Sequence, residues 1–245
     1  MGLNESKWRN FWKHYWEHGK NFGDWDELCQ TQYEALKRVL PRTDLKILEA
    51  GSGTGRVSIR LALEGAKVVL MDFSINALQI SEGFARKLGV QVHPIVGSIF
   101  AIPFKDKSFD VVWNSGVLEH YSEEMQRKAL AEMIRVCKIG GLVISIVPYY
   151  YAIFYRCAKR YLELRGKWKF GTEKPIKTLR HFLPTNTSLV CEFDAGHDLH
   201  LNWLCSFDFL PRIIRRPESS PYLYKWLIKR IRGYLLVSVA ERTAE

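Results

Sequence analysis

Three glycines follow an acidic residue at every second position, Gly51, Gly53 and Gly55 after Glu49. An apolar run precedes them and a helix-like pattern follows them, so they fall where a strand turns into a helix. Glycine adopts backbone conformations that other residues avoid, and it lets a ligand approach the main chain closely. This arrangement indicates a binding site for a nucleotide-type cofactor.

The spacing distinguishes between classes of cofactor site. A phosphate-binding P-loop requires a lysine after its last glycine, and none is present. A dinucleotide fold prefers a third glycine where Arg56 stands. Asp72 ends the next apolar run, 21 residues after Gly51. A carboxylate at that place is suited to accept hydrogen bonds from two ribose hydroxyls.

The elements that must position these residues alternate along the chain. Short apolar runs predict strands, and amphipathic segments between them predict helices, which together indicate a parallel sheet covered on both faces. The predicted strands are 47–50, 67–72, 90–96, 109–113 and 142–147. The predicted helices are 31–40, 56–64, 75–88 and one from Ser122 to Cys137, ended by Gly140 and Gly141.

The alternation stops after Pro148. Helices are predicted over 149–165, 207–216 and 222–232, and strands over 190–194 and 234–239. The chain then divides into an N-terminal aromatic helical lid (1–40), a cofactor-binding core (41–148), a helical cap insertion (149–189), and late strands with basic helices that complete the same domain (190–245).

Composition narrows the possible classes of protein. A hydrophobic content of 47% in 245 residues predicts a packed globular protein. No apolar run reaches the length of a spanning helix. Five cysteines without a C-x-x-C motif are typical of free thiols, which favours the cytoplasm. Of the net charge of +10, most lies in residues 149–245, with 17 Lys and Arg against 9 Asp and Glu.

Five ordered segments resemble the class I S-adenosylmethionine-dependent methyltransferases, in particular the type 11 methyltransferase domain family. They are the E-x-G-x-G-x-G pattern at 49–55, Asp72, the I-P-F and S-F-D-V-V stretches at 102–104 and 108–112, the V-L-E-H at 117–120 and the R-V-C-K-I-G-G at 135–141. The resemblance implies an α/β fold with a Rossmann-like, doubly wound, seven-stranded and mostly parallel sheet. The last strand would be antiparallel.

The resemblance also implies S-adenosylmethionine as the cofactor. Residues expected to bind it are Glu49, Gly51, Ser52, Gly53, Gly55, Arg56, Asp72, Phe73, Ser98, Ile99, Asn114 and Ser115. Glu49 would lie near the cationic amino group, or would cap backbone amides instead. Phe73 would lie against adenine, or serve as a core residue. Ser98 departs from the aspartate that is frequent in the family.

The acceptor side has weaker signals. His120 is the candidate general base, with anchoring of a helix start as the alternative. His14, Tyr15, Tyr121 and Tyr149 are candidates for the acceptor pocket. His197 and His200 have metal-ligand spacing without an evident third ligand, so no metal site is predicted.

These observations predict methyl transfer to an oxygen, nitrogen or carbon atom of a small molecule, either amphipathic or acidic. One alternative is a methyltransferase that modifies RNA or protein through the basic C-terminal part, although nucleic acid is not the expected partner. Another is a non-catalytic member that binds the cofactor. Residues 222–232 suit either a helix packed on the sheet or a peripheral membrane contact. The acceptor and the oligomeric state stay open.

Overall fold

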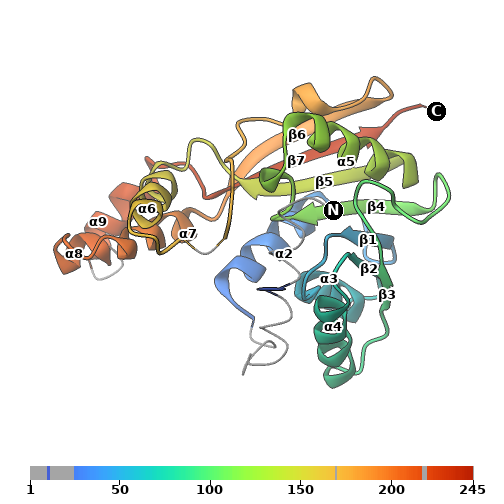
Figure 1. Cartoon of the computed structure of the whole chain (residues 1–245), viewed down its shortest axis with the longest axis horizontal. Helices are drawn as coiled ribbons and strands as arrows, with labels where there is room; N and C mark the ends of the chain where they lie inside the picture. The colour runs from blue at the N-terminus through green and yellow to red at the C-terminus, as the bar shows by residue number, and fades with distance from the viewer. Residues whose placement is uncertain (1–9, 12–24, 169, 217–219, 245) are drawn as a thin grey trace.

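A seven-stranded sheet forms the centre of the protein (Figure 1). The computed structural model describes residues 10–11, 25–168, 170–216 and 220–244. The strand order is β3-β2-β1-β4-β5-β7-β6, and β7 runs antiparallel to both of its neighbours while the other pairs are parallel. The strands are β1 (Lys46–Ala50), β2 (Lys67–Asp72), β3 (His93–Val96), β4 (Phe109–Ser115), β5 (Cys137–Pro148), β6 (Thr187–Ala195) and β7 (Leu235–Arg242). The predicted seven-stranded α/β fold is confirmed.

Helices cover both faces of the sheet: α2 (Glu27–Val39), α3 (Arg56–Leu63) and α4 (Ile75–Lys87) pack on one face and α5 (Glu123–Val136) on the other. The later helices are α6 (Ile153–Leu164), α7 (His197–Asn202), α8 (Arg212–Arg215) and α9 (Pro221–Ile228). Short 3-10 turns lie at η1 (Leu118–His120), η2 (Arg180–Phe182) and η3 (Trp203–Ser206).

Alternation along the central strands creates two separate cores. Ile47 of β1 packs with residues of α2, α3 and α4, and the next residue, Leu48, packs with residues of α5 on the opposite face. All residues of β1 and β2 except the first lysine of each are buried. Strands that are buried on both faces read as continuous apolar runs, which is why the sequence located them well.

The end of α5 differs from the prediction. The helix ends at Val136, and β5 begins at Cys137, so Gly140 and Gly141 lie inside the strand and do not end the helix. A Cβ atom on Gly141 would lie 2.7 Å from both the Asp110 carbonyl oxygen and Cys137 Sγ. The glycine therefore permits close packing at this point of the strand. From the sequence alone, a glycine needed for such packing looks the same as a glycine that ends a helix.

Residues after β5 also differ in detail from the predictions. The helix predicted from 149 begins at Ile153, the one predicted over 207–216 is reduced to α8, and α7 was not predicted. Strand β6 begins at Thr187, so the expected boundary at 189/190 falls within a strand.

Helices α6 to α9 gather beyond one end of the sheet (Figure 1). The connection that follows α6 is tied back to β5, because Ile176 N donates to the Pro148 carbonyl (2.9 Å) and Tyr150 N donates to the Ile176 carbonyl (2.9 Å). Lys174 N also donates to the Glu119 carbonyl of η1 (2.8 Å). These bonds hold the cap segment against the carboxyl ends of β4 and β5. Most of the predicted N-terminal lid lies outside the described residues.

Candidate functional site

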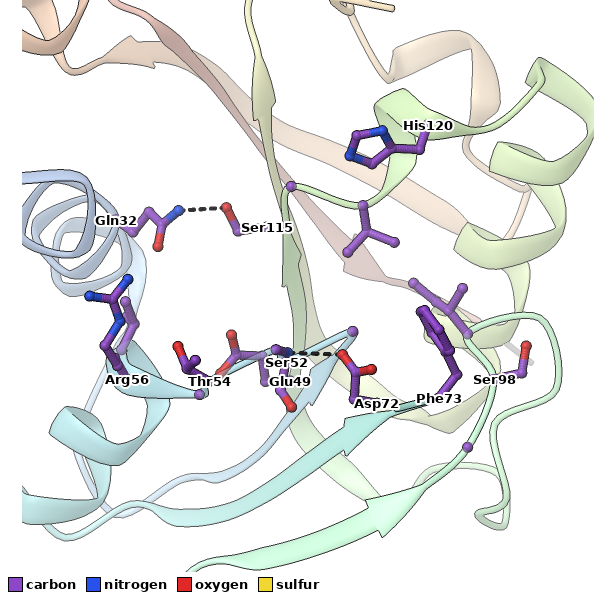
Figure 2. A pocket seen from close by; sticks show the side chains of 18 of the residues that line it. Gln32, Glu49, Ser52, Thr54, Arg56, Asp72, Phe73, Ser98, Ser115 and His120 are labelled. Carbon is purple, nitrogen blue, oxygen red and sulfur yellow. Dashed lines mark hydrogen bonds between the residues drawn. The ribbon is translucent and has the colours of Figure 1, made fainter. Parts of the chain in front are cut away.

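A cavity of about 290 Å³ opens at the carboxyl ends of β1, β2 and β4. Its walls are the glycine turn at 51–55, Asp72 and Phe73, the turn at 97–100, residues 115–117, and Leu28 and Gln32 from α2. Figure 2 shows Gln32 and Arg56 on one side of the cavity, Asp72 and Phe73 along its floor and His120 above them. This is the edge where open α/β sheets bind ligands.

The glycine turn has a left-handed backbone at all three glycines, with φ of 83°, 51° and 62° at Gly51, Gly53 and Gly55. Two of the glycines are also required by space. A Cβ atom at Gly51 would lie 2.7 Å from Val117 Cγ2, and one at Gly55 would lie 2.6 Å from Leu70 Cδ1. The turn therefore exposes bare backbone to the cavity, as the spacing predicted.

Asp72 fixes this turn from below. It is 4% exposed, and its carboxylate accepts hydrogen bonds from Gly53 N (2.9 Å, dashed in Figure 2) and Ser74 N (2.8 Å). The two bonds fix the orientation of the carboxylate at the cavity floor. A carboxylate oxygen has more than one lone pair, so both oxygens retain capacity to accept from a ligand's hydroxyls.

Glu49 is buried beneath the glycine turn. Burial raises the pKa of its carboxyl to about 8. Among the described residues, neither its Oε2 nor the hydroxyl of neighbouring Ser52 has a hydrogen-bond partner. Buried polar atoms are normally paired, so these two atoms fit an absent polar partner. A cationic amino group, such as that of S-adenosylmethionine, matches an acidic acceptor here.

Arg56 begins α3 and contacts α2. Its guanidinium lies 3.0 Å from the carboxylate of Asp26, which also caps α2 by accepting from Cys29 N (2.8 Å). Arg56 lines the cavity, and the ion pair connects α3 to α2, whose Gln32 lies on the same side of the cavity. In this structure Arg56 therefore acts as a brace between the two helices.

The other end of the cavity has the residues expected around adenine. Phe73, Ser98 and Ile99 line it together with Phe100. Ser98 Oγ accepts from Phe100 N (3.3 Å), so this hydroxyl also supports the turn that carries Ile99.

Asn114 does not line the cavity, contrary to expectation. Successive strand residues point to opposite faces, and Asn114 points towards α5, where its Nδ2 lies 3.5 Å from Met133 Sδ. The next residue, Ser115, does line the cavity and accepts a hydrogen bond from Gln32 Nε2 (2.8 Å). Gln32 was not predicted, because no sequence pattern connects a helix residue to a strand end 83 positions later.

His120 stands where two cavities meet. The first is the cavity described above, and the second, of about 500 Å³, extends under the cap. Both include Leu28, Gln32, Ser115, Gly116 and His120. His120 Nδ1 lies 2.8 Å from the Thr172 carbonyl oxygen, which only accepts, so Nδ1 carries the proton. Burial lowers the pKa of the ring, which favours the neutral form.

The predicted acceptor residues are only partly brought together. Tyr121 lines the first cavity and packs edge-on against Phe100, with ring centroids 4.8 Å apart. Tyr149 lines neither cavity; it packs against Tyr151 and the core beside α5. Tyr149 directly follows β5, and its backbone forms a parallel bridge with Ile176, which turns its side chain towards that core. His14 and Tyr15 lie outside the described residues.

His200 has a structural place. Its Nε2 accepts from Phe154 N (2.9 Å) and its Nδ1 contacts the Arg232 carbonyl, so the buried ring joins α6 to the segment before β7. Within the described part of the chain, no group of three or more His, Cys, Asp or Glu side chains has the arrangement of a metal site. In the same residues, no helix is long and apolar enough to cross a membrane.

Known proteins resemble this chain in both sequence and fold. Residues 47–141 match the family model described as a methyltransferase domain. A demethylmenaquinone methyltransferase of Renibacterium salmoninarum is 39% identical over 99 residues, which is 40% of this chain and 39% of the relative. The match therefore spans about two fifths of the length of that relative.

Two solved structures show the same fold over most of the chain. The PH0226 protein of Pyrococcus horikoshii OT3 has a TM-score of 0.63 at 16% identity, covering 94% of this chain and 98% of that one. Geranyl diphosphate C-methyltransferase of Streptomyces coelicolor A3(2), in complex with Mg²⁺, geranyl diphosphate and S-adenosyl-L-homocysteine, has a TM-score of 0.60 at 16% identity. It covers 86% of this chain and 76% of that one. The matched segment, the sheet order and the glycine turn therefore agree in their similarity to a methyltransferase domain.

Proposed function

We propose that the protein transfers the methyl group of S-adenosylmethionine to a small amphipathic molecule held under the cap. The observation that carries this proposal is the pair of adjoining cavities that share His120, Ser115 and Gln32. One has the features of a cofactor site, and the other is lined largely by apolar and aromatic side chains. An acceptor in the second cavity would reach the first at this junction.

Each part of the first cavity fits part of the cofactor. We assign Asp72 to the ribose hydroxyls, Glu49 to the amino group, and Phe73 and Ile99 to adenine. The glycine turn would give the methionine part close access to the backbone. S-adenosylmethionine, when bound, supplies a methyl group on a positively charged sulfur that is already electrophilic.

The protein must then align the acceptor with the methyl group and exclude water from the site. We assign to His120 the removal of a proton from an acceptor that holds one tightly. Its Nδ1 proton is directed to the Thr172 carbonyl, so the basic lone pair is on Nε2. The lowered pKa keeps that lone pair available at neutral pH.

Calorimetric titration with S-adenosylmethionine, S-adenosylhomocysteine and NADH tests the cofactor. We expect micromolar binding of the first two and none of NADH. Binding of NADH alone would overturn the cofactor assignment.

Labelled methyl donor and a cell extract separated into small molecules, RNA and protein test the acceptor class. We expect label in the small-molecule fraction. Label in RNA or protein would favour the macromolecular alternative. If RNA is the acceptor, the incorporation of label should also fall steeply as the salt concentration rises. Tight cofactor binding without label in any fraction would favour the non-catalytic alternative.

A further inference from the structure

Aromatic rings from the cap and the late part of the chain form much of the second cavity. Trp168, Phe170, Trp203 and Tyr234 line it. Their ring centroids form a continuous group, with 5.2 Å between Trp168 and Phe170, 6.0 Å between Trp168 and Trp203 and 5.7 Å between Trp203 and Tyr234. The faces of such rings attract cations.

Two carboxyl groups line the same cavity. Glu119 of η1 is 2% exposed and Glu173 of the cap segment is 9% exposed. The Oε2 atom of each is buried without a hydrogen-bond partner among the described residues. Leaving a buried polar group unpaired is unfavourable, and the cost is larger for a charged group. A bound molecule would supply the missing partner of both atoms, while the Tyr155 hydroxyl acts on the Glu173 carboxyl as a hydrogen-bond donor.

No cation of the described chain compensates these carboxyls from within the cavity. Apart from the two glutamates, the ionisable residues that line the cavity are His120 and Tyr234. No lysine or arginine is among the described lining residues. Lys159 is the nearby cation that acts on Glu173. It lies over the Trp168 ring at 5.3 Å, pairs with Glu163 and does not line the cavity. The interior of the cavity is acidic although the chain as a whole is basic.

We propose that this cavity recognises the acceptor by a cationic nitrogen, an amine or quaternary ammonium on an apolar body, held by Glu119 and Glu173 against the aromatic rings. The inference rests on the proposed function, because it names the class of molecule that the second cavity takes. It replaces the acidic acceptor considered from the sequence, since an anion here would face two carboxyls and no compensating cation of the lining.

The electrostatics of the cavity agree with this occupant. Burial raises the pKa of both carboxyls, and the charge of Glu173 raises the pKa of Glu119 further. Each carboxyl therefore keeps its proton to a higher pH than an exposed glutamate does. A bound cation stabilises the ionised form of both groups, so its binding should release protons to the solvent.

A charge series of equal size tests the proposal. Calorimetry in the presence of saturating S-adenosylhomocysteine would compare 2-phenylethylamine, 2-phenylethanol and phenylacetate, which differ at the group that meets the carboxyls. We expect the amine to bind at least about tenfold more tightly than the alcohol, as cation–π and charge-assisted bonds allow, and phenylacetate to bind weakest. Repetition in two buffers of different ionisation heat should reveal proton release with the amine.

Variants locate the effect. Glu119→Gln and Glu173→Gln keep side-chain size and remove the charge, and each should reduce the preference for the amine towards that for the alcohol. Glu123→Gln, an exposed residue at the start of α5, is the matched control and should keep the full preference. Urea unfolding of each variant verifies that the fold is retained.

The outcomes separate the two proposals. Equal binding of amine and alcohol to the wild type, absence of amine binding at millimolar concentration, or an unchanged preference in both glutamine variants would each overturn the cationic acceptor while S-adenosylhomocysteine still binds. Failure of S-adenosylhomocysteine to bind would instead overturn the proposed function. The charge series can still be measured without it.

Discussion

At the scale of single residues, Asp72 is the side chain on which the cofactor assignment depends most. It orders the glycine turn through Gly53 and Ser74, and it is the group assigned to the ribose. We expect Asp72→Ala to weaken S-adenosylmethionine binding by about 1–3 kcal/mol, the value of hydrogen bonds to a charged group. Calorimetry measures this, with Asp44→Ala as an exposed control. Unchanged affinity in Asp72→Ala would contradict the ribose assignment.

The raised pKa of Glu49 predicts how the stability of the protein depends on pH. Its pKa is about 8 in the folded protein against 4.5 ordinarily, so the folded state binds an extra proton between these values. The free energy of unfolding of the cofactor-free protein should therefore decrease as pH rises from 4.5 to 8.

Glu119 and Glu173 act in the same direction, so the effect of Glu49 is isolated by comparison with Glu49→Gln. Urea unfolding at several pH values should show a steeper decrease for the wild type than for the variant. Parallel curves would mean that Glu49 is ionised in the folded protein.

The residue-level site was largely predictable because it depends on local backbone requirements. Glycines at a strand-to-helix turn and a carboxylate at the next strand end are fixed by short-range geometry, and eleven of the twelve expected cofactor residues line the cavity. Asn114 does not line the cavity, because a shift of one position along a strand reverses the face. Gln32 and Glu173 were missed because they reach the cavities from elements that are distant in the sequence.

At the scale of elements, α2 forms a wall common to both cavities and depends on Asp26. This residue caps α2 and pairs with Arg56. Asp26→Ala should lower the free energy of unfolding by about 1 kcal/mol, as loss of an N-cap does, and weaken cofactor binding. Asp26→Asn keeps a capping oxygen and should keep most of the stability. Urea unfolding and calorimetry test both variants, and equal losses in stability would show that the cap contributes little.

The same scale shows why some elements were mispredicted. Strands buried on both faces and helices with one apolar face were found to within a few residues. Glycines at 140–141 have the composition of a helix stop but serve strand packing. Helix α7 is short and held through His200 to α6, so its stability comes from tertiary contacts that no local pattern contains.

At the scale of the whole molecule, the late helices carry exposed apolar side chains within the basic part of the chain. Ile213, Tyr222 and Trp226 are 53%, 90% and 53% exposed, and α8 and α9 lie farthest from the sheet in Figure 1. The membrane contact considered from the sequence therefore stays a prediction.

We expect the protein to sediment with vesicles containing phosphatidylserine, less with pure phosphatidylcholine and less at high salt. Trp226→Ser should reduce binding, and Trp25→Ser, on the opposite part of the chain, should not. Equal sedimentation with both lipids would contradict an electrostatic contribution.

The shared wall formed by Leu28 and Gln32 has a thermodynamic consequence. Two ligands that touch the same helix cannot occupy their sites independently if either one changes the position or order of that helix. If a bound methyl donor changes the affinity for the acceptor by some factor, a bound acceptor changes the affinity for the donor by the same factor. The ion pair between Asp26 and Arg56 holds this helix to α3, so its removal should change that shared factor.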